Sequence, residues 1–156
     1  MNGQIFQISV SPGGVPKTAI AQSTVTATGL AEDQQQTPGI HGGPERAVCL
    51  WSLEIIQQLQ REGHSALAPG CAGENVTLTG LDWSWVVPGV KVQLGATVML
   101  QVASYAAPCR KNMHWFSDRR YSRISHKHHP GCSRVYARVL QPGVITAGDA
   151  ARLVVG

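Results

Sequence analysis

The chain has 156 residues, of which 43% are hydrophobic, and a formal net charge of +4. This length supports one hydrophobic core, so we expect a single domain over residues 1–156. No apolar run approaches the roughly 20 residues of a membrane-spanning helix, and the start of the chain lacks a secretory signal pattern; we therefore expect a cytoplasmic protein with no membrane partner.

Alternating apolar residues, bounded by Gly, Pro or polar turns, predict a series of short strands. These expected strands cover residues 7–10, 76–79, 90–94, 98–102, 135–139 and 153–155. The Gly95-Ala96 turn joins two of them into a predicted hairpin.

A helix is predicted from Ser52 to Glu62. Ser52 is a suitable N-cap, Ile55 and Leu59 are spaced for one face, and Gly63 can adopt the left-handed conformation that ends a helix. Six or more strands with one clear helix and short helical turns favour a mostly β fold, a closed or nearly closed β-barrel.

The positive charge is concentrated near the C-terminal end. Eight of the thirteen Lys and Arg residues fall between Arg110 and Arg138, where Asp118 is the only acid. Such a segment suits an anionic partner, either a phosphorylated small molecule or a nucleic acid. A solvated surface that aids solubility is the equally simple alternative.

The four cysteines, Cys49, Cys71, Cys109 and Cys132, form no CxxC pair, and the chain is long enough to fold without disulfides. We expect reduced thiols. Cys109 is the predicted reactive residue, because it follows a strand and because the adjacent Arg110 and Lys111 favour a thiolate, the form that binds soft metals or attacks electrophiles.

The other cysteines carry weaker signals. Cys49 lies in an apolar run and is expected to be an inert packed thiol, whereas the roles of Cys71 and Cys132 stay open. His126, His128, His129 and Cys132 lie close together, but the second pair of ligands of a structural zinc site is missing, and zinc is not expected.

Two further segments interrupt the strand pattern. Glycines in His41-Gly42-Gly43 allow a tight turn whose N–H groups can face an anion, although such turns are more often purely structural. Glu74 and Asn75 directly precede the strand from Val76, where side chains can reach a ligand at a barrel mouth or, alternatively, bond nearby turn backbone.

Taken together in this order, these segments resemble the MOSC family, the C-terminal domain of molybdenum cofactor sulfurases, in its small stand-alone bacterial form. The resemblance rests on residues 41–50, 62–64, 69–75, 80–83, 108–109, 133–140 and 148–149. In residues 29–33 the chain departs from the family pattern, reading Gly-Leu-Ala-Glu-Asp where relatives often carry Gly-Asp after Gly-Leu.

The resemblance implies a barrel-like fold whose pocket binds the molybdenum cofactor, a phosphorylated pterin with a dithiolene-bound metal. It makes Cys109 the expected catalytic residue, as metal ligand or sulfur carrier. The expected cofactor-binding residues are His41, Gly42, Gly43, Arg46, Glu74, Asn75 and Arg110. Arginines suit the pterin phosphate because a guanidinium binds it bidentately.

Three functions follow as hypotheses. The first is a molybdenum-dependent reductase of N-hydroxylated compounds, with a small-molecule substrate and an electron-donor protein as partners. The second is a sulfur carrier that holds a persulfide on Cys109 and depends on a separate cysteine desulfurase, since no pyridoxal phosphate domain is expected in this chain. The third, a nucleic-acid-binding module using residues 110–138, ranks last because no recognised nucleic-acid motif is present.

Overall fold

The structure, a computed structural model, describes residues 1–11, 13, 15–33 and 43–154. Its strands and helical segments occur in this order: β1 (Asn2–Val10), β2 (Thr18–Ile20), β3 (Gln22–Thr26), β4 (Gly29–Leu30), η1 (Pro44–Arg46), β5 (Val48–Ser52), α2 (Leu53–Arg61), β6 (Val76–Thr79), η2 (Trp83–Trp85), β7 (Lys91–Leu94), β8 (Val98–Tyr105), η3 (Arg110–Trp115), η4 (Tyr121–Ile124), β9 (Val135–Gln141), β10 (Gly143–Thr146) and β11 (Ala150–Val154). The η segments are short 3₁₀ helices. The predicted mostly β class is confirmed.

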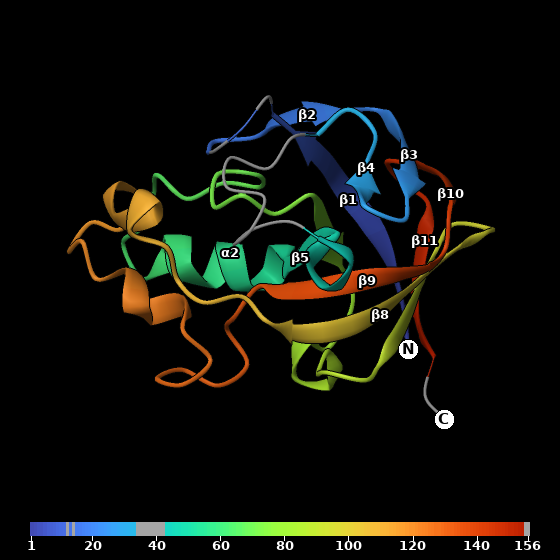
Figure 1. Cartoon of the computed structure of the whole chain (residues 1–156). Coiled ribbons are helices and arrows are strands. Elements are labelled where there is room, and N and C mark those ends of the chain that lie inside the picture. Colours follow the sequence, from blue (N-terminus) through green and yellow to red (C-terminus); the bar gives the residue numbers. More distant parts are fainter. Residues whose placement is uncertain (12, 14, 34–42, 155–156) are drawn as a thin grey trace.

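The main sheet closes into a barrel (Figure 1). Its strand order is β11-β7-β8-β9-β5-β6-β1-β2, and β11 also pairs with β1, so that seven of the described strands close the barrel while β2 lies outside on β1. Closure satisfies the backbone groups that an open edge would leave unpaired. The described strands β3, β4 and β10 form a second, three-stranded sheet. The predicted barrel is therefore confirmed.

Each of the six predicted strands has a counterpart in the structure. β7 and β8 form the expected antiparallel hairpin around Gly95, with Leu94 opposite Val98. The final strand begins at Ala150, earlier than predicted, and Val155 lies outside the described residues. The prediction missed β2, β3, β4 and β10, because these strands are short and three of them have no clear apolar alternation.

The predicted helix is α2. The Ser52 hydroxyl accepts a hydrogen bond from the Ile55 N–H at 3.2 Å, and Gly63 has a φ of 108° just after the C-cap. Ile56 and Leu59 are buried against the barrel. Because α2 returns the chain to the same end of the barrel, β5 and β6 pair in parallel.

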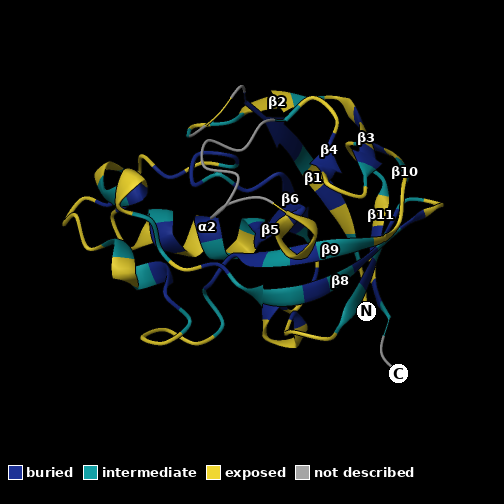
Figure 2. Cartoon of the chain, viewed as in Figure 1, coloured by how far each residue is buried: buried dark blue, intermediate teal, exposed yellow. Residues whose placement is uncertain are grey.

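Strand β5 is buried along its whole length (Figure 2). One face points into the barrel, and the other is covered by neighbouring segments; the Trp51 indole N–H, for example, donates to the Cys132 carbonyl at 3.0 Å. A strand covered on both faces loses the usual alternation of apolar and polar residues. This explains the continuous apolar sequence of residues 47–51.

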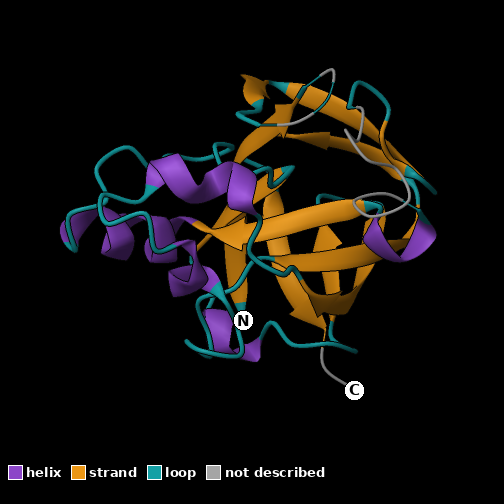
Figure 3. Ribbon diagram, turned by 60° about the vertical axis from the view of Figure 1, so that its left-hand side comes forward, coloured by secondary structure: helices purple, strands orange, loops and turns teal. Residues whose placement is uncertain are grey.

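The helical segments gather mainly at one side of the strands (Figure 3). There η4 is fixed to the end of α2 by Arg123, whose guanidinium donates to both carboxylate oxygens of Glu62 at 2.9 and 2.8 Å. No helix in the described ranges is long and apolar enough to span a membrane.

Candidate functional site

Four neighbouring strands carry the predicted site segments. The register places Tyr136 of β9 opposite Cys49 of β5 and opposite Ser104 of β8. Leu50 in turn lies opposite Val76, the residue after Asn75. The starts of β6 and β9 and the end of β8 therefore meet beside Leu50, in the middle of β5, and Cys109 follows the end of β8 by four residues.

Cys109 lies in the turn that leads into η3. Its side chain is half-buried, and its thiol makes no hydrogen bond to any described residue. The Asn112 N–H donates to the Cys109 carbonyl at 2.9 Å, and the buried Asn112 side chain donates to the Ala72 carbonyl at 3.1 Å. These two bonds hold the Cys109 turn beside the loop of residues 70–75.

The segment from Gly43 to Arg46 lies along β9, where Arg46 is over Tyr136 and Glu45 pairs with Arg138. Gly43 has a φ of 93°, a conformation that favours glycine, and it precedes η1. The exposed Arg46 guanidinium lies over the Tyr136 ring, 5.4 Å from its centroid. His41 and Gly42, predicted as cofactor-binding residues, lie outside the described residues. Arg110 is exposed directly after Cys109.

Tyr136 is a site residue that the sequence analysis did not select. Burial raises the pKa of Tyr136 to about 12; the charges of Cys49 and Cys109 add to this shift, while those of Arg134 and Arg46 oppose it. Its phenol is thus electrostatically coupled to the predicted reactive thiol and to two cations. Tyr136 fits the alternating pattern of β9, so nothing in the sequence distinguishes it from an ordinary strand residue.

Glu74 and Asn75 are buried and bonded within the protein. Asn75 Oδ1 accepts the Cys49 N–H at 2.9 Å, and Glu74 Oε2 accepts the Gly70 N–H at 3.0 Å. Glu74 Oε1 is buried with no hydrogen-bond partner among the described groups, and burial raises the pKa of this carboxyl. Glu74 therefore bonds nearby turn backbone, as in the alternative reading, with one acceptor unused, whereas Asn75 bonds the distant residues Cys49 and Asp33.

A buried ion pair contacts the loop of residues 70–75 through Asn75. Lys17 Nζ lies 2.7 Å from Asp33 Oδ1, and the two side chains are only 8% and 3% exposed. Asp33 also accepts the Ser11 N–H at 2.9 Å. The sequence analysis treated Asp33 only as part of a departure from a family pattern, because its partner Lys17 gives no local signal.

The remaining cysteines differ in environment. All four are free thiols. Burial raises the pKa of Cys49 to about 11 and that of Cys71 to about 12, so both remain protonated near neutral pH. Cys132 is half-buried and accepts a hydrogen bond from Arg123 Nη1 at 3.3 Å. Cys109 is thus the half-buried cysteine at the convergence of the site segments.

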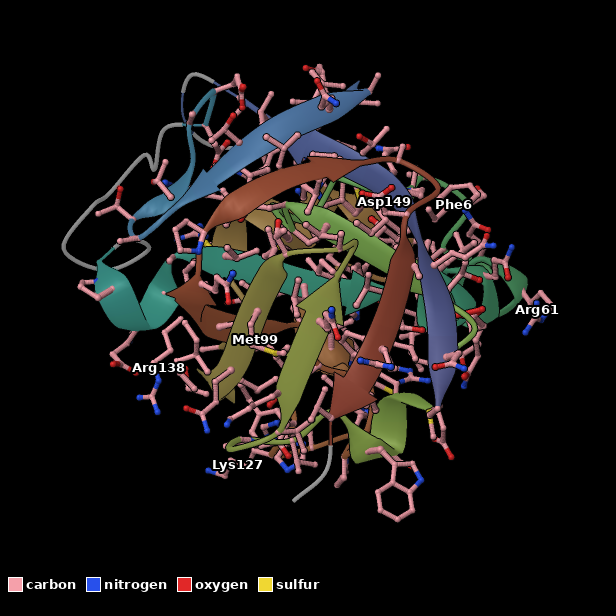
Figure 4. All side chains as sticks on the ribbon, turned by 90° about the vertical axis from the view of Figure 1, so that its right-hand side faces the viewer. Phe6, Arg61, Met99, Lys127, Arg138 and Asp149 are labelled. Atoms are coloured by element: carbon pink, nitrogen blue, oxygen red, sulfur yellow. The ribbon has the colours of Figure 1, made fainter. Side chains whose placement is uncertain are left out.

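Three cations of the basic segment are buried or paired within the protein. Arg134 is buried, Arg123 pairs with Glu62, and Arg138 pairs with Glu45 at 3.3 Å. Arg138 extends outward from the barrel, as does Lys127 (Figure 4). Several of the cations that suggested a nucleic-acid surface therefore stabilise the protein itself.

A small cleft of about 220 Å³ lies elsewhere, between η2 and the segment around Pro130. Trp83, Tyr105 and His126 contribute to its wall, and the last two rings stack with centroids 3.6 Å apart. None of the described residues predicted for the cofactor lines this cleft. No group of three potential metal ligands occurs within residues 1–33 and 43–154 as far as these are described.

The sequence matches the family model of the MOSC domain over residues 37–152. Protein YiiM of Escherichia coli strain K12 is 34% identical over 120 residues, which cover 70% of this chain and 52% of that protein. The chain thus spans about half the length of the curated relative it matches.

Solved structures share the fold. The crystal structure of YiiM from Geobacillus stearothermophilus matches with a TM-score of 0.74 at 26% identity, covering 98% of this chain and 75% of that one. YUAD protein from Bacillus subtilis matches with a TM-score of 0.78 over 98% of this chain and 96% of its own; at 15% identity this likeness concerns the fold alone.

Proposed function

Because the chain belongs to the MOSC domain family, we propose that it binds the molybdenum cofactor with Cys109 as the metal ligand. The observation that carries the proposal is that the half-buried Cys109 thiol and the Arg46 guanidinium both lie near Tyr136 of β9. These groups come from separate segments and would contact one bound ligand.

The chemistry of these residues fits the cofactor. A thiolate is a suitable ligand for a soft metal, and the Cys109 thiol is not engaged with any group in the described part of the chain. The Arg46 guanidinium makes no ion pair with a described carboxylate and rests on an aromatic ring, which leaves its donors for a phosphate. Arg110 adds an exposed second cation.

The other predicted pocket residues have supporting roles in the proposal. Asn75 fixes the start of β5 through the Cys49 N–H, and Glu74 fixes the turn at Gly70. Oε1 of Glu74 is buried with no hydrogen-bond partner among the described groups. His41, Gly42 and Gly43 are proposed to contribute backbone N–H groups.

The proposed reaction is the reduction of an N-hydroxylated compound. The N–O bond breaks, an N–H bond forms, and the oxygen leaves as water after uptake of two electrons and two protons. The bound cofactor would supply the redox-active metal, and an electron-donor protein would supply the electrons. The chain's own residues bind the phosphate, hold the thiol in place and limit its exposure to water.

Elemental analysis tests the proposal. Protein purified from cells that make the cofactor should contain molybdenum close to one atom per chain, and Cys109→Ser should lose most of it. Cys132→Ser is the matched control, because Cys132 is also half-buried but bonds to Arg123 outside the site. Equal molybdenum content in Cys109→Ser and wild type, or none in any sample, would reject the cofactor proposal.

The exposure of Cys109 also suits a sulfur carrier, our second proposal. The Cys109 thiolate would attack the outer sulfur of a persulfide on a cysteine desulfurase, and the donor cysteine would leave as a thiolate. Incubation with a desulfurase and free cysteine should then add the mass of one sulfur atom to the Cys109 peptide. This result without molybdenum uptake would favour the carrier over the reductase.

A further inference from the structure

Arg134 differs from the other cations of residues 110–138 by its burial. Its side chain and backbone are only 4% exposed in total, whereas Arg110, Arg119 and Arg120 are exposed. Burying a guanidinium is strongly unfavourable unless its donors are satisfied. Arg134 makes no ion pair with any carboxylate of the described residues; other acceptors hold its Nη1 and Nη2, while its Nε is buried with no partner among the described groups.

Those acceptors are two backbone carbonyls from different segments. Arg134 Nη1 donates to the Ala72 carbonyl at 2.8 Å, and Nη2 donates to the Ala107 carbonyl at 2.9 Å. The first carbonyl belongs to the loop of residues 70–75, and the second lies two residues before Cys109. The planar fork of the guanidinium therefore joins the two segments directly.

Neighbouring bonds extend the same connection. The Ala106 N–H donates to the Arg134 carbonyl at 2.9 Å, so the strand end before Cys109 is bound to Arg134 on both its backbone and its side chain. The Ala72 carbonyl also accepts the Asn112 side chain, which belongs to the turn after Cys109. The segments before and after Cys109 are therefore both linked to the Ala72 carbonyl, the first through Arg134 and the second through Asn112.

We propose that Arg134 is a positioning residue for Cys109. The Arg134 guanidinium fixes the position and orientation of the turn that carries the thiol relative to the loop of residues 70–75. The role of Cys109 as a metal ligand or sulfur carrier comes from the proposed function, on which this inference rests. Lysine cannot replace arginine here, because one ammonium group does not present two parallel donors to two carbonyls.

Hydrogen–deuterium exchange and cysteine alkylation test the positioning role of Arg134 without any cofactor. In wild type, the amides of Ala106 and Asn112 should be as protected as those of the barrel strands. In Arg134→Lys and Arg134→Met, exchange over residues 106–112 should accelerate about tenfold or more, since a charged hydrogen bond to each carbonyl is lost. Arg138→Lys is the matched control, because Arg138 is a partly exposed arginine on β9, and it should change nothing in this segment.

Cysteine labelling separates local from global effects. Iodoacetamide should label Cys109 faster relative to Cys132 in the Arg134 variants than in wild type, while the buried Cys49 and Cys71 stay unlabelled. Should Arg134→Met fail to fold, shown by labelling of Cys49 and Cys71, Arg134→Lys and the wild-type exchange pattern decide the question. Unprotected wild-type amides at Ala106 and Asn112, or wild-type behaviour of Arg134→Lys, would overturn the positioning role.

Metal content connects the inference to the proposed function. Arg134→Lys should contain several-fold less molybdenum than wild type although Cys109 is present, and Arg138→Lys should contain the wild-type amount. If wild type itself takes up no molybdenum, the proposed cofactor function fails, while exchange and labelling still report on Arg134. The two failures are therefore distinguishable.

Discussion

Asn75 donates a hydrogen bond from Nδ2 to Asp33 Oδ2 at 2.9 Å, although the two residues are 42 positions apart in the sequence. Through the same side chain Asn75 accepts the Cys49 N–H, and Asp33 pairs with Lys17. One amide therefore connects the start of β5 with a buried ion pair. This network fixes the loop before β6 to β5 and to the buried Lys17–Asp33 pair.

Removing the cation of this network should destabilise the protein strongly. Lys17→Met leaves the Asp33 carboxylate buried without its charged partner, and we expect a loss of about 3 kcal/mol in the free energy of unfolding. Urea denaturation measures the change. Arg138→Met breaks an ion pair whose side chains are 43% and 64% exposed and should cost only about 0.5 kcal/mol. Equal losses in the free energy of unfolding for the two variants would contradict a strongly stabilising role of the buried network.

Gly70 tests how tightly the loop of residues 70–75 fits against β1. Its φ is 86°, and an added Cβ would lie 2.7 Å from Ser9 Oγ and 3.0 Å from the Lys17 carbonyl. Gly70→Ala should therefore lose about 3 kcal/mol from backbone strain and overlap together. Gly89→Ala has a similar φ of 98° with open space around the new Cβ, and should lose only about 1 kcal/mol in the same denaturation experiment. A Gly70→Ala loss no larger than that of Gly89→Ala would show that the contact is absent.

Glu74 should make stability fall with rising pH. Burial raises its pKa above the ordinary value of 4.5, so the folded state holds the proton more tightly than the unfolded state. The free-energy cost of ionising the buried carboxyl therefore grows as pH rises from 4.5 through the folded-state pKa. Glu74→Gln keeps an acceptor for the Gly70 N–H without this charge. Its stability relative to wild type should therefore increase with pH across that window.

Glu62→Gln is the control with the opposite sign. The hydrogen bond from Arg123 lowers the pKa of Glu62. The stabilisation that the Glu62 carboxylate contributes is therefore present above pH 4.5 and is lost as pH falls through the folded-state pKa. Thermal unfolding over a pH series should show the two variants diverging from wild type in opposite directions. Parallel curves for both would refute the assignment of Glu74 as a buried, proton-retaining acid.

The cysteines should react in an order set by their environments. At about pH 8, iodoacetamide should modify Cys109 and Cys132 in the folded protein, because both are half-buried and a thiolate is the reactive form. Cys49 and Cys71 should react only after unfolding, since burial raises their pKa values to about 11 and about 12. Peptide mass spectrometry gives the extent at each site. Early modification of Cys49 or Cys71 in the folded protein would contradict this order.

The sequence alone determined the features that depend on near neighbours. Ser52 and Gly63 define the ends of α2, and Gly95 marks the turn between β7 and β8, because capping and turn chemistry act over a few residues. The motif around Cys109 was also readable, since charge and strand ends are local properties.

The tertiary structure decided what joins distant segments. Closure of the barrel by β1 and β11, the bond from Asn75 to Asp33 and the fork of Arg134 on Ala72 and Ala107 all link residues far apart in the chain. No periodicity encodes such pairs, because each side chain meets the local pattern of its own segment and finds its partner only when the barrel has closed.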